Sequence, residues 1–136
     1  MFENIAVVIP ALDNNQYYSD GDLVRFGDTT LLEWKISQLL GVTGKENIYV
    51  STPSGKIIDL VQSYGVNVVK RSQGSDHSQW IKESVNQIES EFVLWTHATS
   101  PFISAGDYRE MLEIFFNLPK NHDSLITVYQ EQEYIF

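Results

Sequence analysis

The sequence predicts an α/β fold of three layers, in which helices cover both faces of a mostly parallel, doubly wound sheet. Five short apolar segments alternate along the chain with four segments whose apolar residues recur at helical spacing. This alternation is the pattern of repeated βαβ units. The first apolar segment is unbroken and rich in β-branched residues, as is typical of a strand buried on both faces. Because 136 residues suffice for one core, we expect a single domain over residues 1–136.

The expected strands are short and are bounded by polar residues. The first ends at Pro10, because proline has no N–H to donate to a neighbouring strand. The fourth is the most apolar short run after the first, and we expect it at the centre of the sheet. The five strands are predicted at residues 5–9, 47–51, 66–70, 92–95 and 124–129.

Four helices are expected between and after these strands. Polar residues that favour helix starts precede three of them, with Asp28 or Thr29 before the first, Ser54 before the second and Ser104 before the fourth. We interpret all three tryptophans, Trp34, Trp80 and Trp95, as packing residues. The residues expected to face the core are Leu31, Leu32, Ile36, Leu39 and Leu40 in the first helix, Ile57, Ile58, Leu60, Val61 and Tyr64 in the second, Trp80, Ile81, Val85 and Ile88 in the third, and Tyr108, Met111, Leu112, Phe115 and Phe116 in the fourth.

Composition and charge exclude several classes of function. The chain has no cysteine, which excludes disulfides, thiol catalysis and thiolate metal sites. Eighteen acidic residues against nine basic ones give a formal charge of −9, and such a surface repels nucleic acid and anionic membranes. The sequence has no apolar run of about 18 residues that could cross a membrane, and its start does not resemble a signal peptide. We therefore expect no nucleic-acid partner, no membrane partner and a cytoplasmic location.

Polar loops follow three of the expected strands, at residues 11–28, 71–78 and 96–103. In a parallel sheet these loops leave the same edge, and open α/β sheets bind their ligands at that edge. We therefore expect the three loops to line one pocket. The candidate ligand-binding residues are Ala11, Leu12, Asp13, Asn14, Asn15 and Asp22 in the first loop, Arg71 in the second, and His97, Thr99 and Ser100 in the third.

Each candidate also has an ordinary structural interpretation. Asp20 and Asp22 could bind a hard cation, but Asp-Gly is also a turn dipeptide. Residues 13–15 could offer amide groups to a ligand or form a plain turn. His97 could contact a ligand or act as a general base, or be structural, and Arg71 could form a surface salt bridge. No dinucleotide fingerprint, Walker sequence or catalytic triad order is present, so no catalytic residue is assigned.

Five segments resemble one known family in their order and spacing. Residues 5–11 resemble its opening strand, which ends in a Val-Ile-Pro-Ala type sequence, and residues 27–32 resemble its Gly-rich turn into the first helix. Residues 50–52 are similar to the end of its second strand, residues 98–102 to its Thr-Ser-Pro signature, and residues 124–129 to the strand that follows. Over nearly its whole length the chain thus resembles the acylneuraminate cytidylyltransferases and related nucleotidyltransferases, which activate acidic sugars with CTP.

The resemblance implies a Rossmann-like, nucleotide-diphospho-sugar transferase-like fold and an enzyme that joins CTP to an acidic sugar, giving a CMP-sugar. It implies CTP and an acidic sugar as partners and Mg²⁺ as cofactor, and it allows a homodimer. Family members are usually longer, so we expect this chain to be truncated relative to them, as a fragment or a reduced paralogue. The family's acidic metal ligands are then expected beyond Phe136, and no metal ligand is assigned.

The first loop departs from the family, whose loop is rich in Gly, Lys and Arg because a nucleoside triphosphate carries about four negative charges. The family's early Arg aligns with Leu12, its later Lys with Gly21 and its base-reading Asn with Asp22, while His97 stands where the family carries Gln. We therefore expect weak CTP binding and little turnover by this chain alone. A degenerate, non-catalytic sugar-, nucleotide- or partner-binding domain is the alternative. A glycosyltransferase ranks third, because residues 96–99 lack the Asp-x-Asp it would need.

Overall fold

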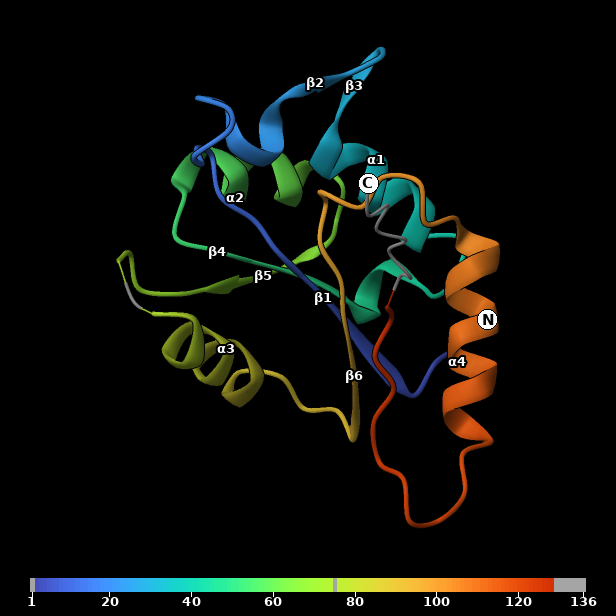
Figure 1. Cartoon of the computed structure of the whole chain (residues 1–136). Coiled ribbons are helices and arrows are strands. Elements are labelled where there is room, and N and C mark those ends of the chain that lie inside the picture. The colour runs from blue at the N-terminus through green and yellow to red at the C-terminus, as the bar shows by residue number, and fades with distance from the viewer. Residues whose placement is uncertain (1, 75, 129–136) are drawn as a thin grey trace, which may run out of the picture.

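The fold is built on a four-stranded parallel sheet with helices on both faces (Figure 1). The computed structural model describes residues 2–74 and 76–128. The sheet has the order β5-β4-β1-β6, so the α/β, mostly parallel, doubly wound prediction is confirmed. The strands are β1 (Ile5–Pro10), β4 (Ile48–Thr52), β5 (Asn67–Lys70) and β6 (Phe92–Trp95), and the helices are α1 (Leu31–Leu39), α2 (Gly55–Ser63), α3 (His77–Asn86) and α4 (Ala105–Phe116).

Strand β1 is central and is buried at every residue. It pairs in parallel with β4 on one side and with β6 on the other, and Val7 lies opposite Ile48 and Leu94. After Pro10, the backbone N–H of Ala11 still donates to the Ser51 carbonyl at 2.9 Å. A continuous apolar run therefore forms the strand that was expected from it, one residue longer than predicted.

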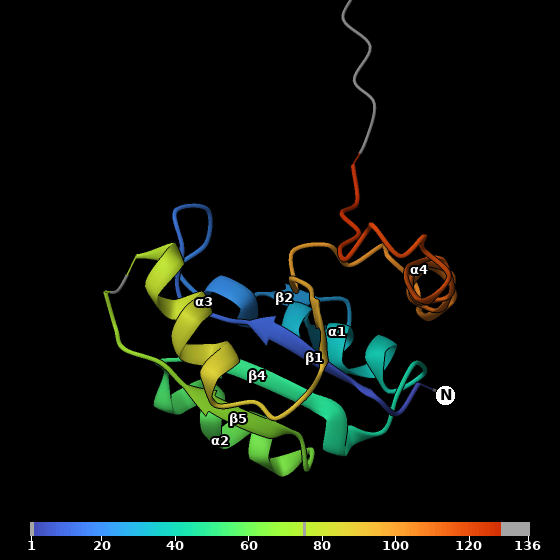
Figure 2. The ribbon, with the colours of Figure 1, turned by 90° about the horizontal axis from the view of Figure 1, so that it is seen from below.

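The helices divide unequally between the two faces of the sheet. Helices α1, α2 and α4 pack on one face, where Ile36, Ile57 and Leu112 join the larger core cluster. Helix α3 covers the other face, and Figure 2 shows it on the opposite side of the sheet from α2. The smaller core cluster there includes Val8 and Ile88. In the described part of the chain, no helix is long and apolar enough to cross a membrane.

Short elements that the sequence did not predict lie in the first loop and before β4. In the first loop, a 3₁₀ turn, η1 (Gly21–Leu23), is followed by a hairpin of β2 (Arg25–Phe26) and β3 (Thr29–Thr30). A second 3₁₀ turn, η2 (Lys45–Asn47), precedes β4. Gly27 has a φ of +62° and occupies the first position of the two-residue hairpin loop, where glycine is favoured in type II′ turns.

Side-chain caps begin the helices, and one expected cap is wrong. Thr30 caps α1 by accepting from the Glu33 N–H, whereas Asp28 and Thr29 do not, because the hairpin carries the chain past them. The predicted caps at Ser54 and Ser104 are confirmed, and Ser104 forms a complete capping box with Asp107.

The prediction that residues 92–95 form a strand is confirmed, but their predicted central place is wrong. Among the described residues, strand β6 pairs with β1 alone and lies at an edge of the sheet, where Val93 is 38% exposed. Residues 124–128 form no strand, and the last predicted residue, 129, lies outside the described part of the chain. Because that segment does not pair with β6, its apolar side chains at Ile126 and Val128 stay exposed.

Several residues expected to face the core are instead exposed. In α3, Trp80 is buried, but Ile81 and Val85 point away from the sheet. The same holds for Leu40, Tyr64 and Phe116, which lie at or beyond helix ends where the buried face no longer meets the sheet. Trp34, expected to pack, is 38% exposed, and its Nε1 donates to the Pro101 carbonyl at 2.9 Å.

Candidate functional site

The candidate site lies where the order of the strands reverses. From β1 the chain moves to β4 and β5 on one side, and then crosses to β6 on the other side of β1. In open α/β sheets, the crevice at the carboxyl ends of the two strands that flank such a reversal is the usual ligand site. Here those ends lead into the first loop after Pro10 and into the segment Thr96–Ser100.

A double hydrogen bond between Leu12 and Asp22 closes the first loop. The Leu12 N–H donates to the Asp22 Oδ2 at 2.8 Å, and the Asp22 N–H donates to the Leu12 carbonyl at 2.9 Å. Gly21 has a φ of +55°, and a Cβ at this position would lie 2.4 Å from the Leu12 carbonyl oxygen. The loop therefore requires glycine here, and a lysine, which the family alignment would place at Gly21, does not fit this backbone.

Asp22 connects the three loops electrostatically. Its side chain is only 8% exposed, and burial raises its pKa, while the bond from Leu12 and the charges of His97 and Arg71 oppose that rise. The charges of two side chains that follow β5 and β6 therefore act on a buried carboxylate of the loop after β1.

Arg71 is held in place from two sides. Its Nε donates to the Ser51 carbonyl at 3.4 Å, and its guanidinium carbon lies 4.2 Å from the centroid of the Trp80 ring, an arrangement of the cation–π type. Burial lowers the pKa of Arg71, and the charges of Asp22 and Glu83 oppose that change. An arginine stays protonated at neutral pH under such a shift, so Arg71 brings a fixed positive charge to the site.

His97 is exposed as a whole residue, but its ring is partly buried. This burial lowers its pKa below the ordinary value of 6.5, the Asp22 charge opposes the change and His77 adds to it, so the neutral form predominates at pH 7. A neutral imidazole offers one donor and one acceptor. His97 can therefore hydrogen-bond a ligand at neutral pH, but it adds no positive charge for a phosphate.

A pocket of about 500 Å³ lies between the first loop, the start of α2 and the start of α3. Asp13 lines it, and its Oδ2 accepts a hydrogen bond of 2.8 Å from the Ser54 hydroxyl. Leu12, Asn14 and Arg71 also line this pocket. Among its described lining residues, Arg71 is the one lysine or arginine.

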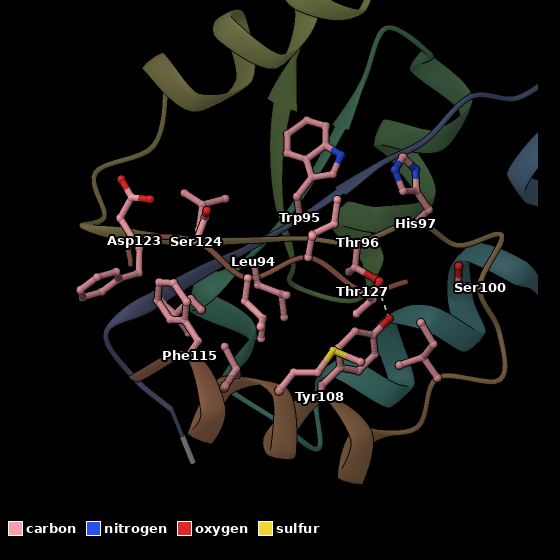
Figure 3. A pocket seen from close by; sticks show the side chains of 18 of the residues that line it. Leu94, Trp95, Thr96, His97, Ser100, Tyr108, Phe115, Asp123, Ser124 and Thr127 are labelled. Carbon is pink, nitrogen blue, oxygen red and sulfur yellow. Dashed lines mark hydrogen bonds between the residues drawn. The ribbon is translucent and has the colours of Figure 1, made fainter. Parts of the chain in front are cut away.

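A second pocket, of about 680 Å³, lies on the other side of β6, between that strand, α4 and residues 123–127 (Figure 3). His97 and Ser100 line this pocket. The expected single pocket is therefore divided: the first loop and Arg71 line one cavity, and the candidates His97 and Ser100 of the third loop line the other. Thr99 is exposed and lines neither of them.

Two of the remaining candidates serve the first loop itself. Ala11 is 1% exposed and continues the pairing of β1 through its backbone. The Asn15 side chain accepts hydrogen bonds from the N–H groups of Tyr17 and Tyr18, as in an Asx turn.

The sequence interpretation overlooked the side chains that support the third loop. Lys35 of α1 is fully buried, and its Nζ donates to the Ser100 carbonyl and to the Tyr108 hydroxyl. Tyr108 also bonds to the Thr96 hydroxyl, as the dashed line in Figure 3 marks. A signal was present, because Lys35 lies three residues after Leu32 and four before Leu39, on the apolar stripe of the helix.

The described residues do not fit a bound Mg²⁺. Within residues 2–74 and 76–128, no three His, Asp or Glu side chains come close enough together to hold a metal ion. Asp22 uses its carboxylate inside the loop, and Asp13 is bonded to Ser54. No step is therefore derived through a metal at this site.

Comparisons with known proteins agree with this fold. A family model described as cytidylyltransferase matches residues 21–136. A CMP:2-keto-3-deoxy-manno-octonic acid synthetase complexed with CTP is 18% identical, with a TM-score of 0.75 over 87% of this chain and 49% of its own. A cytidylyltransferase from Leptospira borgpetersenii is 20% identical, with a TM-score of 0.71 over 85% and 50%.

A more distant neighbour carries a metal. This protein from Mycobacterium tuberculosis H37Rv, in complex with manganese, is 12% identical, with a TM-score of 0.60 over 81% of this chain and 58% of its own. No curated protein matches the sequence. The chain thus spans about half the length of the first two solved structures it matches, and at these identities they show the fold.

Proposed function

Because the chain belongs to the cytidylyltransferase family, we propose that it supplies the nucleotide site for transfer of a cytidylyl group from CTP to an acidic sugar of the acylneuraminate class. A hydroxyl oxygen of the sugar attacks the α-phosphorus of CTP, and the bond from that phosphorus to the β-phosphate oxygen breaks. Pyrophosphate leaves, the hydroxyl loses its proton, and a CMP-sugar forms. In this proposal residues 1–136 act as one domain, in the cytoplasm, and a homodimer is allowed.

One observation carries the proposal: Arg71, which follows β5, lines one pocket with Leu12, Asp13 and Asn14 of the loop that follows β1. Asp22, Arg71 and His97 come from different loops and are coupled electrostatically. A fixed guanidinium beside a pocket of about 500 Å³ suits a phosphate or a base carbonyl. The family supports the reaction class, and this geometry supports the pocket beside Arg71 as the proposed place for CTP.

The first loop should repel a nucleoside triphosphate less than its acidic sequence alone indicates. Asp22 turns its carboxylate inward to the Leu12 N–H, and its raised pKa reflects burial. Asp13 shares one oxygen with Ser54, and Asp20 is exposed. These arrangements reduce the negative charge that faces a ligand, but they supply no cation. Weak CTP binding by this chain therefore remains part of the proposal.

Catalysis by such a domain would consist mainly of positioning and charge neutralisation. Arg71 would oppose the negative charge of the nucleotide, and neutral His97 would donate or accept one hydrogen bond. No described side chain is assigned as the general base. The family's divalent metal would need ligands that the described residues do not bring together.

The alternative is a non-catalytic domain of the same fold that binds a sugar, a nucleotide or a partner. The first loop favours it, because residues 11–28 contain no lysine. Arg25, the cation of this stretch, donates through its Nε to the Gly27 carbonyl within the hairpin.

Two assays separate these functions. Calorimetric or NMR titration of CTP, with and without Mg²⁺, measures binding, and pyrophosphate release with candidate acidic sugars measures turnover. We expect Arg71→Gln to weaken CTP binding about tenfold, by loss of a charge-assisted contact. Arg109→Gln, which lies in α4 but lines neither pocket, should change it less than about twofold. Arg109 is exposed and donates to the Gly41 carbonyl. Equal effects of the two variants would contradict the assigned site, and binding without turnover would favour the non-catalytic domain.

A further inference from the structure

Lys35 is a charged side chain with 0% exposure, placed inside the core face of α1. Burying a charge costs free energy unless hydrogen bonds compensate for the lost water. No carboxylate among the described residues bonds to its Nζ. A lysine in this position therefore calls for an explanation, because methionine or leucine would fill the same space at lower cost.

The bonds of Lys35 all lead to the segment after β6. Its Nζ donates to the Ser100 carbonyl at 2.8 Å and to the Tyr108 hydroxyl at 2.8 Å, and the Ile103 carbonyl lies at 3.5 Å. The Nζ also lies 4.8 Å from the centroid of the Tyr108 ring. Burial lowers the pKa of Lys35 to about 8, so the amine is still protonated at pH 7 and donates to all of these groups.

Neighbouring side chains of α1 hold the same segment. The Trp34 Nε1 and the Gln38 Nε2 both donate to the Pro101 carbonyl at 2.9 Å. At the start of the segment, the Thr96 N–H donates to the Val8 carbonyl at 3.0 Å, and the Thr96 hydroxyl bonds to Tyr108 at 2.5 Å. His97 lies in the turn between these hydrogen bonds, and the Ser100 N–H closes the turn by donating to the His97 carbonyl at 3.3 Å.

We propose that Lys35 is a positioning residue of the nucleotide site, which fixes the His97–Ser100 turn against the end of β1 through the Ser100 carbonyl and the Tyr108 hydroxyl. The inference rests on the proposed function only for the identity of the ligand. Figure 3 shows Tyr108 and Thr96 joined below the strand, with His97 and Ser100 on the turn beyond them. Lys35 acts through the turn and has no contact with the ligand.

A purely structural role predicts a different outcome. If Lys35 only joined α1 to α4, its loss would lower the free energy of unfolding without changing the affinity of the folded protein for a ligand. If Lys35 positions the turn, its loss weakens binding even where every molecule is folded. Amide exchange would then accelerate in residues 96–104 and not in β1.

The test compares Lys35→Met, which keeps the length of the apolar stem, with Lys82→Met as the matched control. Lys82 is an exposed lysine of α3 that lines neither pocket. The probe is CTP with Mg²⁺, titrated by NMR well below the unfolding temperature, beside hydrogen–deuterium exchange of the unliganded proteins. We expect Lys35→Met to weaken CTP binding about tenfold, because small displacements of positioning groups are costly, and Lys82→Met to change it less than about twofold.

Tyr108→Phe keeps the proposal testable if Lys35→Met does not fold. This variant removes one partner of Lys35 and leaves the Ser100 bond, so a smaller change in the same direction is expected. Unchanged affinity in the folded variants, or exchange that accelerates equally throughout the sheet, would overturn the proposal. If the unsubstituted protein fails to bind CTP, the proposed function fails, while exchange confined to residues 96–104 would still support the positioning role.

Discussion

At the scale of single residues, Asp22 shows how a carboxylate in a candidate site can stabilise the loop that carries it. Its position in an Asp-Gly-Asp sequence suggested metal or nucleotide contact, but one of its oxygens accepts the Leu12 N–H and its side chain is 8% exposed. The cost of that burial appears as a raised pKa, and the nearby charges of His97 and Arg71 offset part of it. Asp22 thus holds the first loop closed through its two hydrogen bonds with Leu12.

Substitutions of Asp22 should separate its hydrogen bond from its charge. Asp22→Ala leaves the Leu12 N–H without its acceptor and should lower the free energy of unfolding by about 1–3 kcal/mol. Asp22→Asn keeps an acceptor. Burial raises the folded-state pKa of Asp22 above 3.8. As pH rises from 3.8 through that raised value, the free energy of unfolding of the wild-type protein should therefore fall relative to that of Asp22→Asn. Urea unfolding across that pH range measures both effects, and a wild type that gains stability over Asp22→Asn in this window would contradict the assignment.

At the scale of elements, the first loop depends on a glycine that no side chain can replace. The φ of Gly21 is +55°, and a Cβ there would lie 2.4 Å from the Leu12 carbonyl oxygen and 2.6 Å from the Asn14 nitrogen. Both neighbours are backbone atoms, so they cannot rotate away. A lysine at this position would therefore require a different conformation of the loop.

Alanine at two glycines makes this loop testable. Gly21→Ala should lower the free energy of unfolding by about 1–3 kcal/mol, from strain at a positive φ. Gly55→Ala, at the first residue of α2 and with nothing within 4 Å of its Cβ position, should raise it by about 0.4–1 kcal/mol. Chemical denaturation of the two variants measures the difference. A Gly21→Ala protein as stable as wild type would show that the loop adopts another conformation.

The elements that the sequence predicted correctly are those whose own residues specify them. Strand β1 is apolar throughout and is buried throughout, and Ser54 and Ser104 cap helices as their side chains allow. The place of β6 at an edge could not be predicted, because the apolarity of a strand does not say which strands pair with it. The β2–β3 hairpin consists of two-residue strands, which are too short to leave a periodic pattern.

The candidate site was predictable in outline and not in detail. That loops after β1, β5 and β6 leave one edge follows from the parallel sheet, and Arg71 and His97 were found in this way. Lys35 was overlooked because a lysine in a helix ordinarily faces water, and its partners Ser100 and Tyr108 lie more than 60 residues away in sequence. Hydrogen bonds over such separations require the tertiary structure.

At the scale of the whole molecule, charge opposes the proposed ligand. The chain has a formal charge of −9, and the described lining of the pocket of about 500 Å³ has Arg71 as its one lysine or arginine. A triphosphate that approaches this protein is repelled over distances comparable to the Debye length, which is about 10 Å at 0.1 M salt. At that distance the net negative charge outweighs the attraction by Arg71, which becomes strong only near contact, where salt screens it less because the residue is partly buried.

This balance predicts an unusual dependence of CTP binding on salt. A site with a basic loop loses affinity as salt rises, because screening weakens its attraction for phosphates. Here, raising NaCl from about 0.05 to about 0.3 M shortens the screening length and should leave the affinity for CTP unchanged or increase it. Arg71→Gln removes the contact attraction and should make the increase larger.

Titrations at several salt concentrations with constant free Mg²⁺ measure this, and cytidine, which lacks phosphates, is the control that should show little change. A steep loss of affinity with salt would show that cations outside the described pocket lining hold the triphosphate.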